Sequence, residues 1–146
     1  MNAINLQISY FYDYYCVLRD SVEDGYSCLK NCKEEDNVCI ANITREILYQ
    51  FRAIPSFKFI KFPIEVSRIH THMEVPFSVD YQLDKASQRY FDIRQERNIG
   101  IVQLVKPIEG PTIETLLVHI HTKSRTNVVL AYNYAIIEVN VAPYFF

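Results

Sequence analysis

The chain has 146 residues, of which 49% are hydrophobic. This is enough for a single domain whose folding buries about two thirds of the unfolded surface. Its 15 basic and 17 acidic side chains leave a net charge of -2, which excludes the strongly basic surface typical of nucleic-acid-binding proteins. No stretch approaches the roughly 18 apolar residues of a membrane span. Eleven tyrosines and nine phenylalanines against three glycines favour strands over helices.

All cysteines lie within the first 39 residues. They are Cys16, Cys28, Cys32 and Cys39. An even number in a short polar stretch predicts disulfides formed in an oxidising compartment, in any of three pairings. A zinc site is the alternative, although the spacing lacks the paired C-x2-C knuckles of such sites. We therefore expect residues 1–39 to form an N-terminal arm and a disulfide-stapled loop, separate from a β module over residues 40–146.

Asn42 begins an Asn-Ile-Thr triplet, which is an acceptor for N-glycosylation and agrees with secretion. Residues 1–15 contain no Lys or Arg and are interrupted by polar side chains, so they do not resemble a secretory signal peptide. Two explanations stay open. Either the chain is cytosolic and the disulfide interpretation fails, or it is the C-terminal part of a longer secreted chain.

From residue 40 onward, short runs of alternating apolar and polar residues predict strands. These runs cover 43–54, 67–75, 77–83 and 90–93. Between the first two lies a short apolar run with three phenylalanines, closed by Pro63. In the second run the apolar side chains share one face, which places the polar residues of that run on the outward face.

Two apolar runs, 99–105 and 113–120, are joined by a connection with two prolines and a glycine. Because proline cannot donate to a ladder and glycine tolerates tight turns, we predict that the two runs pair as a central hairpin. The last run, 128–141, is apolar on both faces, which predicts a central strand covered on both sides. Seven or eight strands without βαβ alternation predict an all-β, antiparallel β-sandwich-like module.

Two His-x-His motifs are the strongest candidates for chemistry. They are His70 with His72, and His119 with His121. Each motif places two imidazoles on one side of a strand, and two such strands side by side would offer several nitrogens to a metal. The alternative is that both pairs lie on solvent-facing positions. A small metal-dependent β enzyme using these four histidines is therefore the second functional hypothesis, and a carrier with an apolar pocket is the third.

Several basic residues are candidates for contact with an acidic partner such as a sulfated glycan. They are Arg89, Arg94, Arg97, Lys123 and Arg125. Charges of this kind more often form a solvated face, and acidic neighbours dilute their field.

The segment 100–111 reads G-I-V-Q-L-V-K-P-I-E-G-P, and an apolar strand, a polar loop and a last strand follow it. The chain finishes with the aromatic residues of 143–146. This combination resembles the C-terminal module of fibulins and hemicentins, in which a hydrophobic strand runs into R/K-P-x-x-G-P. Residues 47–51 and 91–93 are similar to two further strands of that module. The spacing of the last three cysteines is similar to that before the module in some fibulins.

The resemblance covers about residues 26–146. It implies a secreted, non-enzymatic module of the extracellular matrix, without cofactor, metal or catalytic residues, whose partners are other matrix proteins. The sequence departs from the family in three ways: no calcium-binding repeats precede the module, the aromatic tail differs from the usual one, and the histidine pairs are not part of the pattern.

Overall fold

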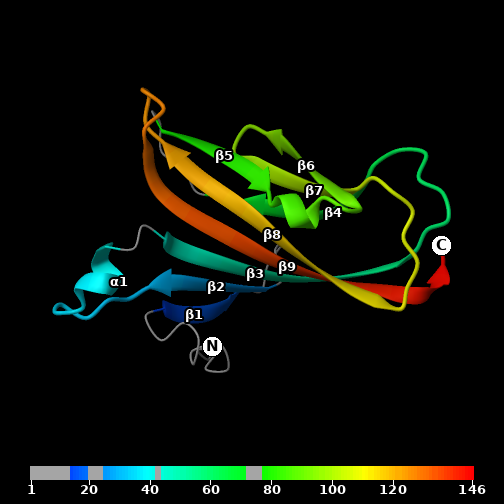
Figure 1. Cartoon of the computed structure of the whole chain (residues 1–146), viewed down its shortest axis with the longest axis horizontal. Coiled ribbons are helices and arrows are strands. Elements are labelled where there is room, and N and C mark those ends of the chain that lie inside the picture. Colours follow the sequence, from blue (N-terminus) through cyan, green and yellow to red (C-terminus); the bar gives the residue numbers. More distant parts are fainter. Residues whose placement is uncertain (1–13, 20–24, 42–43, 72–76) are drawn as a thin grey trace.

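The computed structural model describes residues 14–19, 25–41, 44–71 and 77–146. Within these ranges the chain is almost entirely strand (Figure 1). The elements are β1 (Tyr14–Arg19), β2 (Gly25–Lys30), α1 (Asn37–Ala41), β3 (Thr44–Ser56), β4 (Ile64–His70), β5 (Ser78–Leu83), the 3-10 turn η1 (Lys85–Ser87), β6 (Phe91–Glu96), β7 (Ile99–Leu104), β8 (Thr112–Lys123) and β9 (Val129–Phe145).

These strands form two sheets that pack as a sandwich. The larger sheet has the order β1-β2-β3-β9-β8-β5, and the smaller has the order β4-β7-β6. In Figure 1 the smaller sheet lies over one end of β8 and β9, while β1 and β2 extend the larger sheet away from it. The predicted all-β, sandwich-like fold is confirmed.

One pair of strands is not antiparallel. β3 runs parallel to β9, from Thr44 beside Tyr132 to Ser56 beside Phe145, whereas the other pairs are antiparallel. The chain between β3 and β9 passes through the small sheet and returns along β8. The parallel pair therefore directs the C-terminal ends of both strands toward the same end of the molecule.

The core lies between the two sheets. Val79, Tyr81 and Leu83 alternate inward from β5 as the sequence predicts, and each is less than 10% exposed. The ring of Tyr81 packs on β7 at Gly100, where an added Cβ would lie 2.8 Å from the ring, so a glycine is required for this approach. Gln50 crosses the core as a polar link: its amide donates to the Arg68 carbonyl and accepts from the Ser67 hydroxyl.

The predicted hairpin between residues 99–105 and 113–120 is wrong. β7 pairs with β4 and β6 in the small sheet, and β8 pairs with β5 and β9 in the large sheet. The proline-containing connection carries the chain from one sheet to the other, and on the way Ile108 makes an isolated bridge with Phe57. Proline and glycine in the connection mark a change of direction, which a sheet crossing needs as much as a hairpin does.

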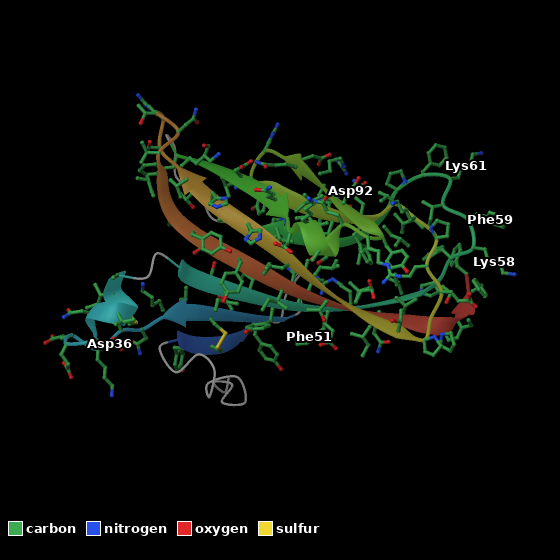
Figure 2. All side chains as sticks on the ribbon, in the orientation of Figure 1. Asp36, Phe51, Lys58, Phe59, Lys61 and Asp92 are labelled. Atoms are coloured by element: carbon green, nitrogen blue, oxygen red, sulfur yellow. A yellow bond between two sulfur atoms is a disulfide. The ribbon has the colours of Figure 1, made fainter. Side chains whose placement is uncertain are left out.

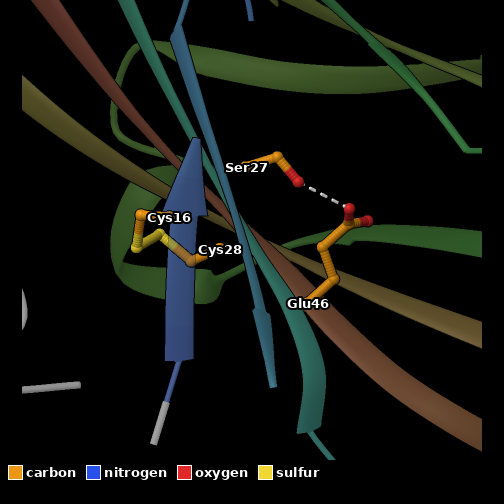
Figure 3. The surroundings of a disulfide bond; sticks show 4 residues. All are labelled: Cys16, Ser27, Cys28 and Glu46. Atoms are coloured by element: carbon orange, nitrogen blue, oxygen red, sulfur yellow. Dashed lines mark hydrogen bonds between the residues drawn. A yellow bond between two sulfur atoms is a disulfide. The ribbon is translucent and has the colours of Figure 1, made fainter. Parts of the chain in front are cut away.

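The N-terminal cysteine segment is not the simple loop that its polarity suggests. β1 and β2 form an antiparallel hairpin that pairs with β3. The Cys16–Cys28 disulfide joins directly opposite residues of β1 and β2 (Figure 3). Ser27 beside it donates a 2.7 Å hydrogen bond to Glu46 of β3. The segment is therefore disulfide-stapled as predicted, and its strands belong to the large sheet.

The Cys16–Cys28 disulfide is part of a second, smaller core. Both cysteines and Ile47 are buried, and Tyr49 and Tyr134 pack against them. Burial and the neighbouring Tyr134 raise the pKa of Tyr49 to about 12. The disulfide thus serves as core material on the side of the large sheet opposite the sandwich.

The second disulfide, Cys32–Cys39, closes a short loop that ends in α1. Asp36 accepts a 3.1 Å hydrogen bond from the backbone N–H of Cys39, which satisfies a donor of the first helical turn. With both disulfides formed, the zinc alternative for the four cysteines is wrong. The proposed boundary at residue 40 falls inside α1 and stays a prediction.

The last strand is central, with β3 on one side and β8 on the other. Its inward face is buried at Ala135, Ile137, Val139 and Val141, but its other face is half-buried to exposed. The prediction of two covered faces is therefore correct for one face only. Among the described residues, no helix has the length and apolarity needed to cross a membrane.

Candidate interaction surface

A group of large aromatic side chains lies uncovered at one end of the molecule. Phe59 is 85% exposed, Phe62 70%, Tyr144 70% and Phe146 95%. Figure 2 shows Phe59 projecting outward there between Lys58 and Lys61. We call this region the aromatic end. It comprises Phe57, Phe59 and Phe62 of the β3–β4 connection with Tyr144, Phe145 and Phe146 at the end of β9.

The parallel pairing of β3 and β9 brings these two distant segments together. The Phe146 amide donates to the Ser56 carbonyl at 3.0 Å, and the rings of Phe57 and Phe146 lie 5.6 Å apart. Beneath them the buried hydroxyl of Ser56 donates to the Ala142 carbonyl at 2.6 Å and accepts from the Gly110 amide at 2.8 Å. A buried polar junction therefore supports the exposed aromatic residues.

Three adjoining hollows cut the surface of the aromatic end. The first, about 470 Å³, lies between Phe57 and the 107–109 segment. The second, about 240 Å³, lies beside Phe59. The third, about 300 Å³, lies between Tyr144 and residues 53–55 of β3. Phe145 belongs to the lining of all three, and we call the three hollows together the aromatic furrow.

The charge beside the furrow is positive. The Lys58 ammonium lies 4.9 Å above the ring of Phe145, and the Lys61 ammonium lies 5.6 Å from the ring of Phe62. Within the described part of the chain neither lysine forms an ion pair with a carboxylate. Glu109 lies with Lys58 in the lining of the first hollow. The furrow thus combines apolar walls with Lys58 and Glu109, and Lys61 lies nearby on the ring of Phe62.

A polar network lies elsewhere, on the outer face of the large sheet. His119 Nε2 is 3.0 Å from Asp84 Oδ1, and His119 Nδ1 is 2.6 Å from the Tyr132 hydroxyl. His121 also packs on the Tyr132 ring, at 5.3 Å between centroids. We call these residues the histidine network. It confirms that His119 and His121 share one face of β8.

The network shifts the pKa values of two of its members. The hydrogen bond from His119, followed by that from the Ala86 amide, holds the pKa of Asp84 below its ordinary value. Burial, followed by the charge of Asp84, raises the pKa of the Tyr132 hydroxyl. Both nitrogens of the His119 ring are engaged within the protein, so this imidazole is used to hold β8, β9 and the β5–η1 turn together.

The three candidate histidines that the structure describes do not form one site. His70 is exposed at the end of β4 in the small sheet, whereas His119 and His121 lie on β8 of the large sheet. His72 falls outside the described residues. Among the residues that the structure describes, no group of three or more His, Cys, Asp or Glu side chains is placed to hold a metal ion.

The basic residues named as candidates for a glycan are dispersed. Lys123 lies 3.4 Å from Asp80, Arg94 pairs with Glu96, and Arg89 lies 5.1 Å from the ring of Tyr90. A sulfated glycan partner stays a prediction. Asn42 falls outside the described residues, so its glycosylation stays a prediction as well.

The aromatic end is a surface that the sequence alone does not predict. The three phenylalanines before Pro63 look like an apolar run, and the tail at 143–146 stands out only through the family resemblance. The available signal was the alternation of Phe57, Lys58, Phe59 with Lys61 and Phe62, because lysines interleaved with aromatic residues indicate exposure rather than burial. No local sequence pattern indicates that the β3–β4 connection and the C-terminal tail lie side by side.

Comparisons with known proteins agree with this architecture. Residues 45–143 match the model of the fibulin C-terminal Ig-like domain. Fibulin-1 of Caenorhabditis elegans is 61% identical over 143 residues, which is 98% of this chain and 19% of that protein. The chain thus spans about a fifth of the length of this relative. The family match runs from the start of β3 to near the end of β9 and includes the β3–β4 connection of the aromatic end, whereas residues 144–146 lie beyond it. The chain belongs to the fibulin family, as a C-terminal Ig-like domain.

Proposed function

We propose that this chain is a secreted, non-enzymatic module of the extracellular matrix that binds other matrix proteins through its aromatic end. The observation that carries the proposal is the exposure of four large aromatic side chains at one end of the molecule, of which Phe59, Tyr144 and Phe146 line the furrow. Large aromatic residues dominate the energetics of protein interfaces, because each removes much apolar surface from water at little cost in conformational entropy.

The arrangement of the aromatic end supports binding rather than accidental exposure. Single exposed apolar residues are common on protein surfaces, whereas contiguous apolar patches rimmed by polar residues are typical of interaction sites. Here Phe57, Phe59, Phe145 and Phe146 line adjoining hollows, and Lys58 and Glu109 are the charged residues among them. The junction at Ser56 fixes the two segments relative to each other, which lowers the entropic cost of binding.

Family membership supports the class of function. The chain corresponds to about a fifth of the fibulin-1 relative. A role of that whole protein is therefore assigned to this chain only as part of the proposal. The two disulfides agree with an oxidising compartment. In this proposal Asn42 carries a glycan, and residues 1–39 connect the module to the chain before it.

The test is retention in a matrix. The chain is secreted from a eukaryotic host and applied to cell-derived, decellularised matrix, and the bound fraction is measured. Substituting Phe59→Ser with Phe62→Ser should lower the bound fraction at least about tenfold, since each lost aromatic anchor costs on the order of 1–2 kcal/mol and about 1.4 kcal/mol is a factor of ten in affinity. The matched control is Val128→Ser with Leu130→Ser, which removes two apolar side chains, 56% and 46% exposed, near the β8–β9 loop.

Equal retention of the two double variants would overturn the proposal. Intact mass before and after reduction, and before and after glycan removal, provides the test of the compartment. Two intact disulfides and a glycan that disappears in Asn42→Gln are expected. Free thiols in the secreted protein would contradict the extracellular assignment.

A further inference from the structure

The loop closed by Cys32–Cys39 has a surface opposite in charge to the aromatic furrow. Residues 33–38 read K-E-E-D-N-V, so Lys33 against three acidic side chains leaves a charge of -2. Glu34 and Glu35 are exposed. Two apolar side chains lie beside them without cover: Val38 is 84% exposed and Ile40 54%. We call residues 33–40 the acidic loop.

The acidic loop and the aromatic end lie at opposite ends of the long axis of the molecule. In Figure 1 the loop and α1 are at one extreme, and the C-terminal end of β9 is at the other. Figure 2 shows the same separation between Asp36 and the trio of Lys58, Phe59 and Lys61. The two surfaces therefore cannot meet within one molecule.

The two surfaces are complementary in charge and in apolarity. Lys58 and Lys61 supply two positive charges at the furrow against the single negative charge of Glu109, and Glu34 and Glu35 supply two negative charges beside Val38 and Ile40. The hollows of about 240 to 470 Å³ are large enough for aliphatic side chains of this size. The disulfide fixes the loop before binding, so little conformational entropy remains to be lost.

We propose that the acidic loop of one copy of this chain docks in the aromatic furrow of another, and that copies associate head to tail. The proposal rests on the binding surface of the proposed function and names an occupant for it. Because the two patches differ and lie at opposite ends, the contact is heterologous, and its repetition produces an open row rather than a closed dimer. One loop in one furrow buries less than a standard interface, so association is weak and falls with salt.

The experiment measures weight-average mass by sedimentation equilibrium over a wide concentration range, with the disulfide-intact 146-residue chain at low salt. The first variant, K58E/K61E, has an acidic loop and an acidic furrow. The second, E34K/E35K, has a basic loop and a basic furrow. The control, R97E/R125E, makes the same charge change as the first variant at two exposed arginines outside both patches.

The native chain should show a mass that rises with concentration, and each patch variant alone should associate at least about tenfold more weakly, because two attractive charge pairs become repulsive. The control should behave as the native chain. An equimolar mixture of the two patch variants should recover association, since each acidic surface then meets a basic one. Circular dichroism and intact mass confirm that the variants are folded with both disulfides.

A native chain that stays monomeric at every concentration would overturn the proposal. So would association that neither variant weakens, or a mixture that does not recover it. The two proposals can fail separately. If Phe59→Ser with Phe62→Ser abolishes matrix retention while the charge variants retain native mass behaviour, the proposed function stands, the aromatic end binds another protein and the acidic loop is not its occupant. If the charge variants fail to associate but matrix retention is unchanged in the phenylalanine variant, only the self-association stands.

Discussion

The aromatic end and the histidine network are both clusters of ring side chains at the surface of the module, but the contacts of these rings differ. In the histidine network every polar atom of His119 has a partner inside the chain, and the Tyr132 ring lies against two imidazoles. At the aromatic end the rings are mostly exposed and the two lysines have no carboxylate partner within the described residues. The network stabilises the fold, whereas the aromatic end has contacts left to make.

This difference shows that a cluster which looks unusual in the sequence can be either structural, as the histidine network is, or available for binding, as the aromatic end is. The His-x-His motif at 119–121 looks chemically active in the sequence, yet its side chains are committed to Asp84 and Tyr132. Phe59 and Phe62 look like core material in the sequence, yet they are exposed. Substitutions can separate the two cases, because a satisfied cluster affects stability and an unsatisfied one affects binding.

The largest effect is expected beneath the aromatic end, at Gly110. A Cβ there would lie 2.2 Å from the Val141 carbonyl oxygen and 2.5 Å from that of Ala142, and both are backbone atoms that cannot move without the strand. Gly110→Ala should lower the free energy of unfolding by more than about 3 kcal/mol. Urea denaturation measures this, with Glu109→Ala at the exposed neighbour expected within about 0.5 kcal/mol of the native chain. A native-like Gly110→Ala would show that the junction is not tightly packed.

The next effect is expected at Ser56. Its hydroxyl is fully buried and serves both the Ala142 carbonyl and the Gly110 amide. Ser56→Ala leaves both groups without their partner and should cost about 2 kcal/mol of unfolding free energy. The exposed Ser78→Ala serves as the matched control in the same denaturation series. Equal stability of the two variants would mean that the buried hydroxyl does not hold the aromatic end in place.

A smaller effect, dependent on pH, is expected in the histidine network. The pKa of Asp84 is lowered in the folded state relative to the ordinary value of 3.8, chiefly by the hydrogen bond from His119. The stabilisation is therefore present above pH 3.8 and is lost as the pH falls through the lowered pKa. Denaturation midpoints should be measured at a series of pH values from above 3.8 downward. As the pH falls, the midpoint should decrease less steeply in Asp84→Asn than in the native chain or in the control Asp92→Asn. Identical slopes would exclude a role for Asp84 in acid stability.

The smallest effect on stability is expected at the rings with the greatest exposure. Phe59→Ser with Phe62→Ser removes side chains that bury little surface, so the free energy of unfolding should change by no more than about 0.5 kcal/mol. Thermal denaturation of the double variant measures this directly. A large loss of stability would mean that these rings pack in solution, and it would remove the contrast between the aromatic end and the histidine network.

The sequence predicts much of this fold, because its strands are amphipathic. Alternation located β5 and its inward residues, and it placed His70 on the outward side of β4, where it is exposed. The even number of cysteines within a short polar stretch predicted disulfides, although not their pairing. These signals are local, since each depends on residues two positions apart or on a short spacing.

Pairing between distant strands could not be predicted in the same way. The run 99–105 ends in a proline-rich connection that is equally suited to a hairpin or to a sheet crossing, and only the packing of β7 between β4 and β6 decides between them. The aromatic end depends on the parallel pairing of β3 with β9, whose paired residues are far apart in the chain. No local pattern around Phe57 or Phe145 predicts that these two segments lie next to each other.

The parallel pairing also determines how the module responds to tension along its length. β1, β3 and β9 run in the same direction, so a pull between Tyr14 and Phe145 displaces the strands along one another. The inter-strand hydrogen bonds are then loaded together, and Cys16–Cys28 keeps β1 from sliding off β2. A pull between Thr112 and Phe145 would instead open the β8–β9 hairpin one bond at a time. Single-molecule force measurements with handles at these two pairs of positions should therefore find the higher unfolding force between Tyr14 and Phe145.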